Sequence, residues 1–114
     1  MQVELEIDTN DSKLAFALFS PAQSLSPGST TETPGNGSLM VREMSFRKGF
    51  GVHETLVLVL TTGRDVVVSV LASWLYDRLK GRARSLRVDG RDVEISDEAV
   101  RIAIAEAIDK EDQS

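Results

Sequence analysis

A β-hairpin near the C-terminus is the feature of this sequence that most constrains the fold. The Asp-Gly pair at 89–90 favours a two-residue turn, and apolar residues alternate with polar ones on both sides of it. With that turn, Leu86 lies opposite Val93 on the apolar face. Arg87 then lies opposite Asp92 on the polar face. The sequence therefore predicts an antiparallel sheet with one buried face.

Two further strands and a final helix follow from local patterns. Residues 3–7 alternate apolar and acidic side chains, which predicts a half-buried first strand, and Leu39 to Arg47 predicts a second. Ser96 can cap a helix whose first turn carries Asp97 and Glu98, where the helix dipole favours acids. Its apolar stripe comprises Val100, Ala103, Ile104, Ala107 and Ile108.

The middle of the chain is ambiguous by pattern alone. Leu56 to Val70 has the β-branched composition of a hairpin, but Val67, Leu71 and Trp74 follow helical spacing. Gly81 resembles a helix stop. The spacing favours two helices, or one broken helix, over Leu56 to Lys80, with Trp74 in the core. Lys13 to Phe19 is compatible with a short helix or a strand.

These elements predict a single α+β domain over residues 1–114. We expect a sheet of three or four strands with helices packed on one face, and a C-terminal β-hairpin followed by a final helix. Residues 20–38 contain all three prolines together with many Gly, Ser and Thr residues. That composition predicts a long flexible loop, either disordered or used as a contact.

The composition narrows the chemistry and the location. The 114 residues include no cysteine, which excludes disulfides, thiolate nucleophiles and cysteine-ligated metals. The first residues lack the basic and apolar regions of a secretory signal. The apolar region Leu56 to Tyr76 is interrupted by charged, turn-prone residues at 61–65, so we expect buried core and no membrane span. The expected location is the cytoplasm.

Charge is distributed unevenly along the chain. The formal net charge is −5, yet residues 78–91 hold six basic side chains and a single acid. The six are Arg78, Lys80, Arg82, Arg84, Arg87 and Arg91. As an interaction site, this basic stretch suits a protein contact, self-association or a nucleic-acid backbone. Because the aromatic platform that stacks single-stranded bases is missing, nucleic acid is the less favoured partner.

No catalytic, metal or cofactor site is expected. His53 is the sole histidine and its neighbour Glu54 does not form a dyad by adjacency on a helix. A weak anion-site candidate precedes the expected helix, where backbone amides and basic side chains could hold a phosphate or carboxylate. Its residues are Arg47, Lys48, Gly49 and Gly51. They match neither the phosphate-loop nor the dinucleotide-binding pattern.

The segment Gly51 to Ile95 resembles the effector-associated constant component family of bacterial conflict systems. The similar features are a Gly-led apolar helix over Gly51 to Leu60, a break at Gly63, a helix ending in Leu71–Arg78, and the strand pair Ser85–Ile95. The resemblance covers less than half of the chain. It implies a non-enzymatic component that acts beside a separate effector such as a protease or nuclease, and it brings no catalytic residues.

The sequence therefore favours a small adaptor or regulatory component that binds another protein, with homo-oligomerisation as a further expectation. The alternative is a nucleic-acid-associated protein that uses Arg78 to Arg91. An enzyme built around His53 and Glu54 is the third hypothesis, and it requires a cleft that contains both residues.

Overall fold

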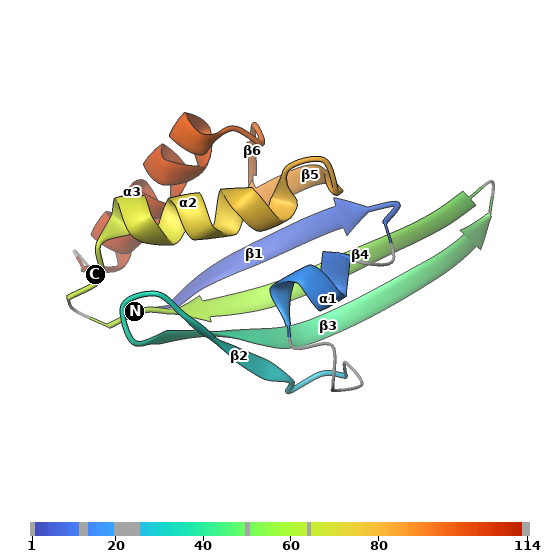
Figure 1. Ribbon diagram of the computed structural model, residues 1–114, viewed down its shortest axis with the longest axis horizontal. Coiled ribbons are helices and arrows are strands. Elements are labelled where there is room, and N and C mark those ends of the chain that lie inside the picture. Colours follow the sequence, from blue (N-terminus) through green and yellow to red (C-terminus); the bar gives the residue numbers. More distant parts are fainter. Residues whose placement is uncertain (1, 12–13, 20–25, 50, 64, 113–114) are drawn as a thin grey trace.

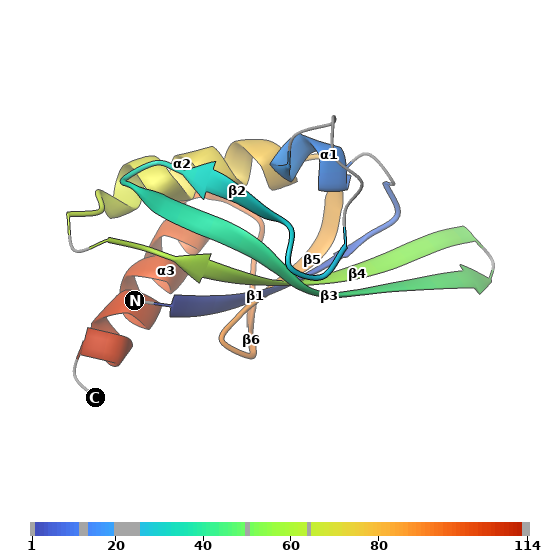
Figure 2. The same ribbon diagram turned by 90° about the horizontal axis from the view of Figure 1, so that it is seen from below.

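A computed structural model describes residues 2–11, 14–19, 26–49, 51–63 and 65–112. Within these ranges, nine elements follow one another along the chain. Figures 1 and 2 show their arrangement. The elements are β1 (Gln2–Thr9), α1 (Leu14–Leu18), β2 (Thr30–Thr33), β3 (Gly37–Gly49), β4 (Gly51–Thr61), α2 (Val68–Leu79), β5 (Ala83–Val88), β6 (Arg91–Val93) and α3 (Asp97–Asp112). Among the described residues, no helix is both long enough and apolar enough to span a bilayer.

The strands form one six-stranded sheet in the order β2-β3-β4-β1-β5-β6, and every neighbouring pair is antiparallel. The α+β class is confirmed, whereas the expected count of three or four strands is too low. The missing members are the short edge strand β2 and the long strand β4. Both were hidden by local composition, because β2 lies in a Pro/Gly/Ser/Thr-rich segment and β4 is apolar at every position from Leu56 to Leu60.

Period-two alternation places one face of the sheet in the core. Leu5, Leu58 and Leu86 lie on this face in β1, β4 and β5, and all three are buried. They pack against buried residues of α2 and α3, among them Leu75 and Ile104. Figure 2 shows α1 and α2 on the same side of the sheet, with α3 beside α2. Burial of apolar surface between these layers is the main stabilising contribution.

The predicted C-terminal hairpin has the expected register. Leu86 pairs with Val93, and Arg87 pairs with Asp92. Asp89 and Gly90 both have positive φ, 51° and 83°, as a type I′ turn requires. The Asp89 amide donates to the Glu4 carbonyl at 2.9 Å, and the Asp89 carboxylate accepts from the Glu4 amide at 3.0 Å. The turn is therefore bonded to β1 as well as closed on itself.

The predicted final helix is also confirmed. It begins at Asp97, and the Ser96 hydroxyl accepts a hydrogen bond from the Ala99 amide at 3.2 Å, as expected for an N-cap. Val100 and Ile104 are buried on the expected stripe. Ser96 thus ends the hairpin segment and starts the helix.

The helix expected over the first part of Leu56 to Lys80 is wrong. Residues 51–61 form β4, which lies between β1 and β3, and the helix α2 begins only at Val68. In β4, Leu56, Leu58 and Leu60 are buried beneath the helices, while Val57 and Val59 are half-buried on the opposite face. Apolar residues on both faces of a central strand remove the period-two signal, so propensity could not separate helix from strand.

Two smaller expectations also differ from the structure. Trp74 is half-buried at the edge of the core rather than inside it, and the guanidinium of Arg78 lies 4.2 Å from the centre of its ring.

In the expected loop over residues 20–38, Thr30–Thr33 pairs with the start of β3, and residues 34–36 form the connecting turn. Residues 20–25 lie outside the described part. Lys13 is likewise outside it, and Leu14–Leu18 adopts the helical alternative.

Strand β3 is much longer than its outer neighbour. The pairing of β2 with β3 ends at Met40, and Val41 makes the last backbone bonds on that side, to Gly28 and Ser29. On the other side, β1 covers β4 from Thr61 only as far as Glu54. Beyond that point, residues 47–49 of β3 and 51–53 of β4 pair only with each other among the described strands. They form a two-stranded arm, which Figure 1 shows extending past β1.

The turn between β2 and β3, at the other end of β3, provides a stability test. A Cβ at Gly37 would overlap the carbonyl oxygen of Thr61 and lie 2.6 Å from the Thr33 hydroxyl oxygen. We expect Gly37→Ala to lower the free energy of unfolding by about 1–3 kcal/mol, because the clash is with backbone. Gly63→Ala is the control, since its nearest new contact is 3.4 Å away. Equal denaturation midpoints for the two variants would contradict the close approach.

Candidate functional site

A groove lies between the β5–β6 hairpin and α3. Its volume is about 430 Å³. Val93 from β6 and Ala99, Ile102 and Ala103 from α3 form its apolar lining. The hairpin turn at 89–90 forms one end, where Asp89 lines the groove. The same local signals that build the hairpin and the final helix therefore also build the two walls.

Ile102 makes this groove an unusual part of the surface. The buried stripe of α3 turns Val100, Ile104 and Ala107 toward the core, and Ile102 lies outside that stripe. Its side chain is 43% exposed, although it is a large hydrophobic residue. Ala99 and Ala103 are small, so they leave space beside it instead of filling it. The result is an apolar hollow open to solvent, which is a feature of binding surfaces.

Charged residues form the rim of the groove, with four acids and two bases among the lining residues. Arg91 joins β6 to α3 through an ion pair with Glu106 at 3.6 Å. In the described part of the chain, Asp89 and Glu94 form no ion pair with a basic side chain. The rim is therefore acidic and retains uncompensated carboxylates.

The structure distributes the predicted basic stretch over several elements. Arg78 lies over Trp74, and Lys80 forms an ion pair with Asp77 at 3.3 Å. Arg82 donates to the carbonyl oxygen of Arg78 at 3.4 Å, and Arg84 donates to the Asn10 side chain at 3.5 Å.

The two remaining bases of the stretch contact acids. Arg87 contacts Glu6 and Asp92, and Arg91 contacts Glu106. Together with Lys80, they form the half of the stretch that is ion-paired. Arg82 and Arg84 are exposed, and no carboxylate pairs with either of them among the described residues.

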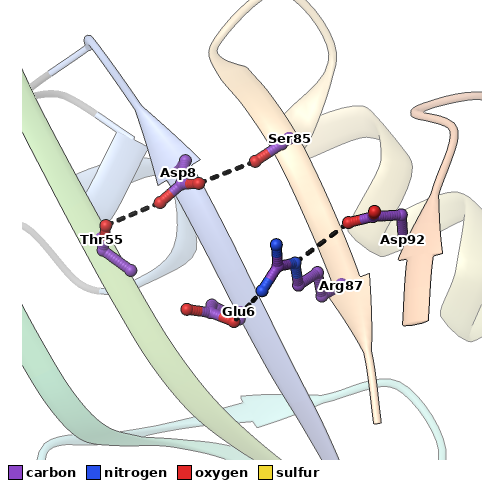
Figure 3. A network of polar contacts seen from close by, with 6 residues as sticks. All are labelled: Glu6, Asp8, Thr55, Ser85, Arg87 and Asp92. Atoms are coloured by element: carbon purple, nitrogen blue, oxygen red, sulfur yellow. Dashed lines mark hydrogen bonds and ion pairs between the residues drawn. The ribbon is translucent and has the colours of Figure 1, made fainter. Parts of the chain in front are cut away.

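Arg87 belongs to a polar network on the helix-free face of the sheet (Figure 3). Its Nε donates to the Asp92 carboxylate at 3.0 Å, and its Nη1 lies 3.6 Å from Glu6. The hydrogen bond to Asp92, followed by the charges of Asp92 and Glu6, raises the pKa of Arg87 above its ordinary value. Arg87 is therefore held as a cation between β1 and β6.

Asp8 connects three strands in the same network. Its carboxylate accepts a hydrogen bond from the Thr55 hydroxyl of β4 at 2.6 Å and another from the Ser85 hydroxyl of β5 at 2.9 Å (Figure 3). Both bonds are part-buried and bring together residues far apart in the sequence. Such an arrangement links β1 to both of its neighbours and stabilises the sheet.

The network predicts unequal effects of its members on stability. We expect Asp8→Ala to lower the free energy of unfolding by about 1–2 kcal/mol, because two hydroxyls lose a charged acceptor. Arg87→Ala should cost less than about 1 kcal/mol, because its ion pairs are exposed to solvent. Urea denaturation of both variants measures the difference. A larger loss for Arg87→Ala would contradict a structural role centred on Asp8.

The weak anion-site candidate does not precede a helix. Arg47, Lys48 and Gly49 end β3, and Gly51 begins β4, so the expected strand-to-helix turn is wrong. Gly49 pairs with Gly51 in a hairpin. The helix amides that the candidate required are therefore absent at this position, while Phe50 and the side chains at 47–49 lie outside the described part.

His53 and Glu54 occupy consecutive positions of β4 rather than the start of a helix. The Glu54 side chain is buried, with 8% exposure, and burial raises its pKa above the ordinary 4.5. The His53 side chain lies outside the described part. Glu54 does not line the groove. Within the described ranges, no group of three or more His, Asp or Glu residues is placed to hold a metal ion.

The buried carboxyl of Glu54 predicts a pH-dependent contribution to stability. A raised pKa means that the folded state binds a proton more tightly than the unfolded state, so this group destabilises the fold as the pH rises through that pKa. We expect Glu54→Gln to increase the free energy of unfolding relative to the natural protein more at neutral pH than at about pH 4. Denaturation across this pH range tests it, and a difference independent of pH would contradict it.

The groove is not predicted by the sequence pattern. One signal was present, because Ile102 is an apolar residue between Arg101 and Ala103 that falls outside the stripe of the final helix. Whether such a residue is solvated or lies in a hollow depends on how closely the hairpin approaches the helix. That approach is a tertiary property.

In comparisons with known proteins, no family model, no curated protein and no solved structure matches this chain. The resemblance of Gly51 to Ile95 to the effector-associated constant component family therefore stays a prediction. The first element of that resemblance, the helix over Gly51 to Leu60, is a strand in the structure. The later elements, a helix ending near Arg78 and a strand pair with an Asp-Gly turn, are present.

Proposed function

We propose that this chain is a non-enzymatic adaptor that holds a segment of another protein in the groove between β6 and α3. The observation that carries the proposal is the exposed side chain of Ile102 beside a hollow lined by alanines. An apolar side chain of the partner that fills this hollow would remove Ile102 from water. Hot spots of protein interfaces commonly lie in well-packed pockets from which water is excluded, and aromatic side chains and arginine are enriched among them.

The rim supports a basic partner segment. Asp89 and Glu94 line the groove without a paired cation in the described part of the chain. A Lys or Arg beside the apolar anchor would therefore gain favourable contacts, whereas an acidic neighbour would be repelled. The groove thus fits a segment in which a large apolar residue is followed or preceded by a basic one.

The wider role in a bacterial conflict system rests on the family resemblance. An adaptor in such a system would hold an effector, such as a protease or nuclease, through the groove. The groove is exposed, as a binding surface for an effector must be. The helix end with Trp74 and Arg78 and the Asp-Gly hairpin, which are both part of the resemblance, are also compatible with that role. The partner's identity as an effector is part of the proposal.

The proposal predicts that Ile102 decides peptide binding. We would select a displayed library of random peptides on the natural protein and measure the affinity of the enriched sequences. We expect apolar residues next to Lys or Arg, and at least a tenfold loss of affinity for Ile102→Asp. Arg101→Asp is the matched control, because residue 101 is exposed on the same helix and does not line the groove.

Two outcomes would overturn the proposal: no enriched sequence, or peptides that bind Ile102→Asp and the natural protein equally.

The nucleic-acid alternative is supported by the exposed Arg82 and Arg84, which have no paired carboxylate in the described part. It requires a different result, namely binding to short duplexes that weakens as salt rises and is unaffected by Ile102→Asp.

A further inference from the structure

The outer edge of β3 is a feature that the groove does not explain. Beyond Val41, the strand continues to Gly49, and in the described part of the chain no other strand lies beside this edge. The backbone on the inner side pairs with β4 along the whole arm. A strand edge of this kind presents backbone donors and acceptors that can pair with another strand.

A β-bulge limits where such pairing can begin. The register between β3 and β4 shifts between Val41 and Glu43, so Arg42 has no opposite residue in β4. The Arg42 side chain instead forms an ion pair with Glu4 at 2.8 Å within the same molecule. Bulges interrupt the regular ladder of a strand. Regular edge pairing is therefore available from Glu43 onward.

The charges of the sequence after the bulge are complementary to those of a second, antiparallel copy. Two identical edges related by a two-fold axis perpendicular to the sheet keep each residue on its own face. The axis must therefore pass midway between one residue and the same residue of the second copy. With the axis at Ser45, Glu43 of one copy lies opposite Arg47 of the other, on the same face as Ser45.

Neighbouring registers lack this complementarity. An axis at Met44 places Arg47 opposite Val41, and an axis at Phe46 places Glu43 opposite Gly49. Opposite charges in directly facing positions stabilise antiparallel pairs. A charged residue opposite an uncharged one, or opposite a like charge, does not gain this stabilisation. The bulge also removes the one unfavourable pair of the Ser45 register, in which Arg42 would face Lys48.

We propose that two copies of this chain associate through β3, antiparallel and centred on Ser45, so that their sheets become continuous. The occupant of the edge is a second copy. Two observations support it: no strand among the described residues pairs with this edge, and the sequence has a glutamate at 43 and an arginine at 47. The contact is separate from the groove between β6 and α3. Self-association therefore does not depend on the proposed partner binding.

Charge reversal tests the register. Glu43→Arg places arginines opposite Arg47 of the second copy, and Arg47→Glu places two glutamates opposite each other, so each variant alone should be monomeric. Mixed in equal amounts, the two variants restore both opposite-charge pairs and should form a heterodimer. Sedimentation of the natural protein, each variant and the mixture across a concentration series measures this. Glu32→Arg, the same change on β2, is the control and should leave the dimer intact.

A cysteine at the axis gives a second test that does not depend on charge. The chain has no cysteine, so Ser45→Cys introduces a single thiol. At a two-fold axis the two thiols face each other across paired strands, within reach of a disulfide. We expect a covalent dimer on mild oxidation, and none for the control Ser38→Cys, whose strand edge is covered by β2.

Each test has an outcome that overturns the proposal. A natural protein that stays monomeric at all concentrations, with no cross-linking of Ser45→Cys beyond the control, excludes the β3 contact. A dimer that survives both Glu43→Arg and Arg47→Glu places self-association elsewhere. Ile102→Asp should dimerise normally while losing its peptide, so failure of either proposal is distinguishable from failure of the other.

Discussion

Packing of β4 between β1 and β3 is the interaction on which the rest of the structure depends. Leu58 of β4 pairs with Leu5 of β1 and Val41 of β3, and all three side chains are buried beneath the helices. This central row holds the sheet together and provides the surface on which α2 packs. The position of β4 also determines where the arm begins, because β4 continues beyond Glu54, the last residue that β1 covers.

The opposite face of the sheet is organised by charge. The acids of β1 lie between basic and hydroxyl side chains of its neighbours, with Glu4 bound to Arg42, Glu6 to Arg87, and Asp8 to two hydroxyls. This arrangement explains why an acidic strand can occupy the middle of a sheet. It also explains why part of the basic stretch is engaged within the molecule.

The parts of the fold that were predictable are those specified by neighbours in the sequence. The Asp-Gly turn, the alternation around it and the Ser96 cap act within a few residues, and the structure has all three. Strand β2 was not predicted, because it is only four residues long and lies between prolines and glycines, so its β-branched threonines gave no recognisable strand pattern and pairing with β3 was decisive. For the candidate site, the walls were predicted as a hairpin and a helix, whereas the hollow between them was not.

The sequence by itself determined the hairpin over residues 86–93 and the helix that begins at Asp97, since turn chemistry, capping and periodicity are local. Only the tertiary structure decided that Gly51–Thr61 is a strand, because a strand apolar on both faces is stabilised by its neighbours and not by its own pattern. The tertiary structure likewise decided which arginines meet carboxylates and which apolar residue of the last helix remains exposed. These outcomes depend on which elements lie side by side, and residues distant in the sequence set that arrangement.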